Sequence, residues 1–492
     1  MLVTVTILDG ALGFSAGPPK GHVKIGVSTA GTVNELVSWT DGQQAKDSHT
    51  SGPLVESSAF SLANGGQPVY GMRVNASVLG TASSVTTTLQ AGSDGALATT
   101  GSSPLDRYDV VVLMTRDGKV GVAPYPAFRY SIDGTDNYSE EIAVPVGGTY
   151  VIPGTGVTLV FSNGVTGFKK DDKFTFTTTA PSYSNTDLQN AFTALKADTR
   201  KWEFVHVLGA ANAATAAVAQ TFVNEMRANG RFVWVLLEAR DIGDGVPGET
   251  EDQWITALSS NYDSFTSPFG QVTVSAGYCE LTSAVSGRLY RRPQAWTVAA
   301  RASAVPFQRD LGRVKDGPLA GIAKNALNVS VYHDERVKPG LETARFLTVQ
   351  SIIGKQGFFV GGPAKRSPST MASLTSDYSL LQNVRVILYA AATCLEQGTD
   401  LLGDEIETNA DGTIQERKAV EIENTLTSRL SDLVVGPGYA VRIKAQLNRS
   451  INLLTTKTVR IKVLVRPFGY AKEIAFELGF ENPNLKTVLA AA

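Results

Sequence analysis

The chain has 492 residues, of which 43% are hydrophobic and 18% are charged, a composition typical of a soluble globular protein with several domains. Its 44 Lys and Arg residues are balanced by 46 Asp and Glu residues, so no global basic field exists that would hold nucleic acid. No apolar run approaches the roughly 18 residues of a membrane-spanning helix, and no N-terminal signal pattern occurs. We therefore expect neither direct nucleic-acid binding nor membrane insertion.

The first residues alternate as a β-strand does. Val3, Val5 and Ile7 alternate with threonines, and a Gly- and Pro-rich break follows over residues 10–19. No hairpin partner for this strand lies nearby, so we expect it to pair elsewhere. Alternation resumes at residues 22–27, which predicts the first strand of a folded core.

Short alternating runs dominate residues 69–181. Turn signals such as Asp117-Gly118 and Asn163-Gly164 separate these runs at the spacing of hairpins. No long helical period occurs here, which predicts a small all-β domain, either a sandwich or a barrel, set into a different architecture. The predicted strands cover residues 84–89, 109–114, 141–146, 149–152, 157–161 and 173–177.

From residue 182 strands and helices alternate, which indicates an α/β layer with a mainly parallel sheet. Gly230 stands where a residue that ends a helix is expected, and Thr250 and Gln253 have the spacing of a capping box. The predicted helices cover residues 186–201, 212–228 and a segment after Thr250, and the predicted strands cover residues 204–208, 232–237 and 271–275.

The last third of the chain combines helices and strands. The predicted helices cover residues 378–396 and 414–433, and the predicted strands cover residues 329–332, 346–353, 440–447, 458–466 and 473–480. In the last of these strands, Ile474, Phe476 and Leu478 alternate with small or polar residues. This strand also has no evident partner, so both termini are predicted to be free strands.

These patterns together predict an α/β core with a C-terminal α+β domain, an inserted all-β domain of sandwich or barrel type, and extended strand arms at both termini. Several separate hydrophobic cores are expected for a chain of this length. The predicted segments are residues 1–20 (N-terminal arm and linker), 21–68 (start of the core), 69–181 (outer all-β domain), 182–325 (α/β domain), 326–472 (C-terminal α+β domain) and 473–492 (C-terminal arm).

Motifs for catalysis are weak. Ser15 lies in a Gly-x-Ser-x-Gly match, but Pro18 and Pro19 exclude the helix that must follow a nucleophile elbow, which favours a linker. No phosphate-binding loop occurs in the sequence. Glu238 and Asp241 follow a predicted parallel strand and are the best enzymatic candidates, although the position is generic and the sequence identifies no partner for them.

A partial calcium-loop pattern occurs near residue 410. Glu407, Asn409 and Asp411 precede Gly412, but Lys418 stands where the closing glutamate of such a loop is required. This substitution favours a solvated turn before a helix.

Histidine and cysteine positions predict no metal site and no disulfide. His206 lies in an apolar strand and is interpreted as a hydrogen-bonded core residue. Cys279 and Cys394 are interpreted as small buried apolar residues. The four histidines are His22, His49, His206 and His333, and their spacing suggests no metal pair. We expect no metal and no cofactor.

The predicted helix over residues 414–433 has one charged face and one apolar face. Its charged residues are interpreted as a solvated face. The alternative is that Arg417, Lys418 and Arg429 contact an inner partner.

Six short stretches in the last 180 residues occur in a recognisable order. They are residues 332–336 (YHDER), 339–341 (PGL), 344–348 (ARFLT), 354–360 (GKQGFFV), 376–378 (SDY) and 381–386 (LQNVRV). In this order, and with the closing helices and strands, the region resembles contractile tail sheath proteins of phages and related injection machines. The Trp-Gly-Ala-Arg-Thr signature of many sheath proteins is absent, which indicates a divergent branch.

The resemblance implies a structural subunit and not an enzyme. Such subunits form stacked hexameric rings, a helical sheath around an inner tail tube protein, and contact baseplate and tail terminator proteins. They assemble in the bacterial host cytoplasm and become part of the virion tail. Contraction drives the tube through the target cell envelope without nucleotide, with which the missing phosphate loop agrees.

In such sheaths each subunit lends its terminal arms to sheets of neighbouring subunits, which is β-strand addition used for assembly. The arm residues implied here are Val3, Val5, Ile7, Ile474, Phe476 and Leu478.

Two other functions stay open in the sequence. A carbohydrate-binding or host-binding tail protein would use the all-β domain, with Tyr125, Phe128 and Tyr130 as an exposed aromatic platform. An α/β hydrolase or transferase would use Glu238 or Asp241.

Overall fold

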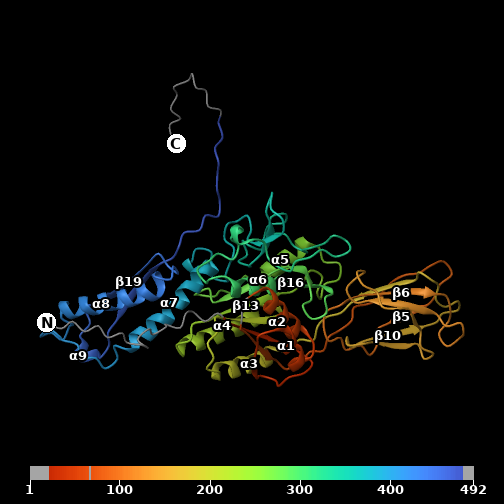
Figure 1. Cartoon of the computed structure of the whole chain (residues 1–492), viewed down its shortest axis with the longest axis horizontal. Helices are drawn as coiled ribbons and strands as arrows, with labels where there is room; N and C mark the ends of the chain where they lie inside the picture. Colours follow the sequence, from red (N-terminus) through yellow and green to blue (C-terminus); the bar gives the residue numbers. More distant parts are fainter. Residues whose placement is uncertain (1–20, 66–67, 480–492) are drawn as a thin grey trace, which may run out of the picture.

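The computed structural model describes residues 21–65 and 68–479. The fold is mixed α/β with several sheets. Figure 1 shows three parts in a row: an all-β domain at one end, an α/β body in the middle, and a module of helices and a hairpin at the other end.

A six-stranded sheet forms the centre of the body, with the order β14-β13-β12-β1-β3-β2. All neighbouring strands are parallel except β2 and β3, which confirms the predicted parallel sheet. β3 lies in the range 69–181, yet it pairs with β1 in this sheet. The strands are β1 (His22–Gly26), β2 (Leu36–Trp39), β3 (Val69–Arg73), β12 (Phe204–Ala211), β13 (Trp234–Ala239) and β14 (Val272–Ser275).

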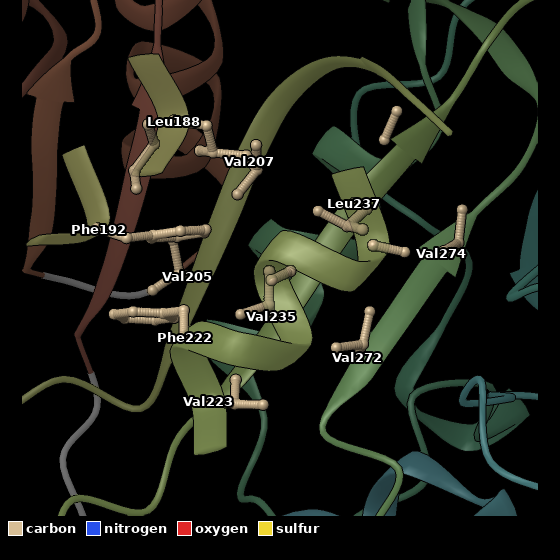
Figure 2. Close-up of a cluster of buried hydrophobic side chains, with 14 of the residues drawn as sticks. Leu188, Phe192, Val205, Val207, Phe222, Val223, Val235, Leu237, Val272 and Val274 are labelled. Carbon is tan, nitrogen blue, oxygen red and sulfur yellow. The ribbon is translucent and has the colours of Figure 1, made fainter. Parts of the chain in front are cut away.

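Helices cover both faces of this sheet. Val205 and Val207 pack against α3 and α4, as Figure 2 shows, whereas Phe204 on the opposite face packs against α6 and α7. Strands buried on both faces are largely apolar, which explains the hydrophobic runs of β12 and β13 on either side of His206 and before Glu238. The helices are α1 (Gly42–His49), α2 (Pro53–Asn64), α3 (Asn185–Ala197), α4 (Ala213–Ala228), α5 (Glu251–Tyr262), α6 (Ala295–Ala304) and α7 (Leu381–Thr399).

The helix signals in the sequence are confirmed in the body. The side chain of Thr250 accepts a hydrogen bond from Gln253 N, and the side-chain oxygen of Gln253 accepts one from Thr250 N, so α5 begins with the predicted capping box. Gly230, with φ of +73°, follows the end of α4.

The all-β domain is a sandwich of two sheets and does not close into a barrel. Val112 and Phe174 from the first sheet and Leu159 from the second are all buried in one common core. The first sheet has the order β4-β11-β6-β7-β8, and the second β5-β10-β9. The strands are β4 (Thr86–Thr88), β5 (Ala96–Ala98), β6 (Asp109–Arg116), β7 (Ala127–Ser131), β8 (Ile142–Ala143), β9 (Thr149–Ile152), β10 (Val157–Ser162) and β11 (Lys173–Thr177).

An irregular region follows the sheet of the body. The strand predicted at residues 329–332 is wrong: Val331 forms only an isolated bridge with Cys279, because the chain runs beside β15 for a few residues and then turns to bury His333. The regular elements are β15 (Tyr278–Thr282), β16 (Leu289–Pro293), β17 (Val349–Ser351), β18 (Phe358–Val360), and the short 3-10 helices η1 (Val314–Asp316) and η2 (Asp377–Ser379).

The C-terminal module continues from α7 and consists of helices packed on an antiparallel hairpin of β19 and β20. The elements predicted between residues 378 and 466 are confirmed: α7 lies three residues later than predicted, and α8, β19 and β20 are shorter than predicted. The strand predicted at residues 473–480 is not formed, since residues 473–479 have no regular structure. The elements are α8 (Glu416–Leu430), the π-helical turn η3 (Ser431–Val435), β19 (Arg442–Leu447), α9 (Leu453–Thr456) and β20 (Ile461–Arg466).

Candidate assembly surfaces and buried polar groups

The C-terminal segment leaves the molecule with its apolar side chains exposed. Beyond residue 473 the chain extends away from the body, as Figure 1 shows. Ile474 is 71% exposed, Phe476 is 82% exposed and Leu478 is 97% exposed. Three large apolar side chains on alternate residues, all in contact with water, are costly unless another surface covers them.

The root of this segment is fastened to the body. Tyr470 Oη donates to the carbonyl oxygen of Gln308 at 2.5 Å, and Lys472 Nζ donates to the carbonyl oxygen of Ser367 at 2.7 Å. Lys472 also pairs with Asp310, and Glu473 pairs with Lys365. The exposed residues therefore start directly after a set of fixed contacts.

The β19–β20 hairpin presents one open edge. On the outer side of β19, Ala445 N donates to Thr427 Oγ1 at 3.0 Å and Leu447 N donates to Glu423 Oε1 at 2.5 Å, so side chains of α8 cover that edge. In the described part of the chain β20 pairs with β19 alone. An unpaired edge is a template for another strand.

Arg417, Lys418 and Arg429, the candidates for contact with an inner partner, all lie on α8. Each forms an ion pair with a neighbouring carboxylate, Arg417 with Glu407 and Arg429 with Asp400. Surface pairs of this kind exchange partners at little cost.

The N-terminal predictions lie outside the described residues. This applies to the arm residues Val3, Val5 and Ile7 and to the Gly-x-Ser-x-Gly match at Ser15.

A line of ionisable groups crosses the face of the sheet beneath α2 and α6. Lys24 Nζ lies 3.1 Å from His206 Nδ1, and His206 Nε2 lies 2.9 Å from Glu238 Oε1. Trp296 Nε1 also donates to Glu238 Oε1, at 2.9 Å, and Gly209 N donates to Oε2 at 2.7 Å. The line joins neighbouring side chains of β1, β12 and β13.

Burial shifts the pKa of each group in this line toward its neutral form. It lowers the pKa of Lys24 to about 7, which Glu238 partly offsets, and lowers the pKa of His206 well below its usual value. It raises the pKa of Glu238 to about 7. The interpretation of His206 as a hydrogen-bonded core residue is confirmed.

The enzymatic candidates are engaged in internal contacts. Both oxygens of Glu238 accept hydrogen bonds within the protein, and the side chain is 2% exposed. Asp241 forms ion pairs with Arg107 at 2.9 Å and Arg291 at 2.6 Å. The sequence identified no partner for either residue, because the partners are distant in the chain. Both arginines are 50 or more positions from Asp241, and Gly209 and Trp296 are 29 and 58 positions from Glu238.

A cavity of about 360 Å³ lies beside Glu238, at the carboxyl ends of β1 and β12. Parallel sheets bind ligands at such a position. Its walls are largely apolar, with Leu79, Leu208 and Trp296 among them, and its arginines are paired with aspartates. The cavity therefore presents no free charge for a ligand.

Buried carboxylates hold loops within and between the stretches that resemble sheath proteins. Glu342 accepts hydrogen bonds from the main-chain nitrogens of Ala364, Arg366 and Ser367 at 2.6–2.7 Å. His333 lies between Glu335 and Glu251, each 2.8 Å away. These polar residues are structural.

The remaining polar candidates are also accounted for. Among the described residues no group of His, Cys, Asp and Glu side chains could hold a metal ion. Asn409 and Asp411 form a tight turn before α8, as predicted. Both cysteines are free, but Cys394 is only half-buried, whereas Cys279 is buried.

The aromatic platform of the all-β domain is absent. Phe128 is fully buried in the sandwich core, against Tyr150 and Phe161, and Tyr130 is half-buried. Tyr125 is exposed by 37%. The three residues do not form one exposed surface.

Sequence reasoning missed the root of the C-terminal segment. Tyr470 and Lys472 are separated from Gln308 and Asp310 by 162 positions, and no local pattern connects them. The one signal in the sequence was Lys472, a basic residue directly before the alternating residues 473–480.

No helix in the described ranges is long and apolar enough to cross a membrane. No curated protein matches the chain.

Two solved structures are similar to the chain. One is a sheath tail protein of Listeria innocua, with 10% sequence identity, a TM-score of 0.43, and coverage of 92% of this chain and 96% of that chain. The other is a sheath tail protein of Desulfitobacterium hafniense, with 11% identity, a TM-score of 0.45, and coverage of 95% and 100%.

A family model described as DUF2586, N-terminal domain, matches residues 2–362. This range includes the all-β domain and most of the body. It covers well over half of the 492 residues, and the chain belongs to the DUF2586 family.

Proposed function

We propose that the chain is the structural subunit of a contractile tail sheath, which polymerises around an inner tube and contracts to drive that tube through a cell envelope. The order of short stretches in the C-terminal third supports this proposal. The observation that carries it is the C-terminal segment, in which Ile474, Phe476 and Leu478 are exposed directly beyond a fixed root.

In the proposed assembly, the segment of one copy adds as a strand to the open β20 edge of another copy. Main-chain hydrogen bonds would join the two strands, and the alternate side chains Ile474, Phe476 and Leu478 would lie on one face, where a second layer covers them. Donor and acceptor are different surfaces of the same chain. Such a heterologous contact repeats without closing along an axis and produces a helical filament.

The proposal includes the partners that a sheath requires. Copies form stacked hexameric rings around an inner tail tube protein, with Arg417, Lys418 and Arg429 of α8 as candidate tube contacts. The ends of the sheath contact baseplate and tail terminator proteins, and the assembly belongs to the virion tail. No catalytic step is part of the proposal.

Neither alternative function has a specific observation in its favour. A carbohydrate-binding platform is contradicted by the burial of Phe128, and both oxygens of Glu238 are already hydrogen-bonded.

The test replaces Ile474, Phe476 and Leu478 with serine and examines the purified protein by electron microscopy. We expect the parent chain to form long hollow tubes and the triple variant to remain as single copies or short rings. The matched control changes the other face of the same strand, Ala475→Ser with Glu477→Gln, and keeps its tubes. Tubes of the triple variant at parental yield would refute strand donation by this segment.

A further inference from the structure

The all-β domain joins the body through more than its two chain connections. The segment that enters the sandwich and the segment that leaves it lie side by side, with β-bridges between Val78 and Ser182 and between Ala82 and Thr178. Two connections alone would form a hinge. Figure 1 shows β16 of the body close to the base of the sandwich.

The strand β16 contacts both parts because its side chains alternate between two faces. Tyr290 and Arg292 are directed to the all-β domain, and Arg291, between them, is directed to the body. Tyr290 is 7% exposed and belongs to the core of the sandwich, with its ring 6.1 Å from that of Tyr108.

Arg292 is bound on the same side of β16. Its Nη2 lies 2.8 Å from Asp106 Oδ2, and its Nη1 donates to the carbonyl oxygen of Arg107 at 3.1 Å. The side chains of Arg292 and Asp106 are 4% and 7% exposed. A pair so well shielded from water is weakly screened by salt.

A second set of contacts runs in the opposite direction, from the all-β domain to the body. Arg107 lies 2.9 Å from Asp241 and 5.3 Å from the centre of the Tyr278 ring. Asp241 is also held by Arg291, at 2.6 Å. Directly before β16, Arg288 of the body pairs with Asp133 of the all-β domain at 3.1 Å, in the same direction as Arg292.

We propose that β16 couples the all-β domain rigidly to the α/β body, so that the two parts move as one unit and not about their two connections as a hinge. Tyr290 supplies a shared hydrophobic core, and the crossed arginine pairs fix the orientation. Separation of the two parts would break these arginine–aspartate pairs. Because a buried charge without its partner is unfavourable, the pairs oppose any partial separation. This coupling does not depend on the proposed function.

The test measures the distance between the two parts. Spin labels are attached to Thr87→Cys on β4 and Asn190→Cys on α3, both exposed positions, in a chain that carries Cys394→Ala. Labelled protein is diluted into a large excess of unlabelled protein, so that only distances within one copy are observed. Pulsed electron paramagnetic resonance should give one narrow distance distribution.

The double variant Arg107→Gln with Arg292→Gln should broaden this distribution and add longer distances. The control Arg129→Gln, at an exposed position of β7, should leave it narrow. A broad distribution in the parent chain, or a narrow one in a folded double variant, would overturn the proposal. Circular dichroism establishes folding, and Asp106→Asn, which removes one ion pair alone, provides the same test if the double variant does not fold.

Discussion

The α/β body and the C-terminal segment carry the same alternation of apolar residues, with opposite outcomes. Val23 and Ile25 of β1 are fully buried, because neighbouring strands and helices cover both faces of their sheet. Ile474 and Phe476 are at least 71% exposed. Alternation thus specifies a strand that must be covered, and it does not specify whether the cover comes from the same chain. The two regions should therefore differ in what a substitution changes: stability in the body, assembly in the segment.

The largest effect on stability is expected at Glu342. Glu342→Leu leaves three main-chain N–H groups, one buried and two partly buried, without an acceptor, and each buried group of this kind costs roughly 1–3 kcal/mol. We expect the free energy of unfolding to fall by about 3 kcal/mol. Urea denaturation followed by tryptophan fluorescence measures this change.

All five tryptophans lie in the body, namely Trp39, Trp202, Trp234, Trp254 and Trp296, so fluorescence reports this region. Glu342→Gln keeps one acceptor and should cost less. The control Glu405→Leu, at an exposed position, should change the free energy by about 0.5 kcal/mol or less. If Glu342→Leu were as stable as this control, Glu342 would not stabilise the body.

A smaller effect is expected from pH, through His333. Burial lowers the pKa of His333, but the hydrogen bonds to Glu335 and Glu251 outweigh burial and raise it above 6.5. The folded protein then holds this proton more tightly than the unfolded chain. The stabilisation is complete below pH 6.5 and is lost as the pH rises through the raised pKa.

The slope for one proton is at most about 1.4 kcal/mol per pH unit. Unfolding free energies measured on either side of pH 6.5 check the prediction, with His333→Gln as the comparison. If His333→Gln kept the parental dependence of the unfolding free energy on pH in this range, groups other than His333 would cause that dependence.

The smallest effect on stability is expected at the root of the C-terminal segment. Lys472→Met removes a partly exposed ion pair with Asp310, which is worth about 1 kcal/mol or less. Release of the root should nevertheless increase the rate of chymotrypsin cleavage at Tyr470, whose hydroxyl is bonded to Gln308. The control is Lys462→Met on the exposed face of β20. Cleavage at the parental rate in Lys472→Met would mean that this residue does not hold the segment.

Local patterns predicted much of the fold. The strands β9 and β11 have the predicted bounds, and the capping box of α5 is present. Each of these depends on residues close together in the sequence, where turn chemistry and periodicity act. The helices α1, α2 and α6 and the hairpin β15–β16 were not predicted, because tertiary contacts override weak local preference in these segments.

The contacts that define the candidate surfaces could not be predicted. Lys24, His206 and Glu238 come from three separate strands, and their proximity follows from sheet order. The cover on the β19 edge depends on Thr427 and Glu423, which meet β19 only after α8 has packed on the hairpin. Such relationships are set by topology and not by sequence spacing.

The fixed root of the C-terminal segment determines where a mechanical load would enter the molecule. Tension applied to residues 474–479 first reaches Glu473 and Lys472, which are bound to Lys365, Asp310 and Ser367 of the body. The stretch 467–469 between β20 and this root would stay slack, so the hairpin would carry no part of the pull made on its own chain. One copy would then bear tension through its body and leave β20 undisturbed as an acceptor.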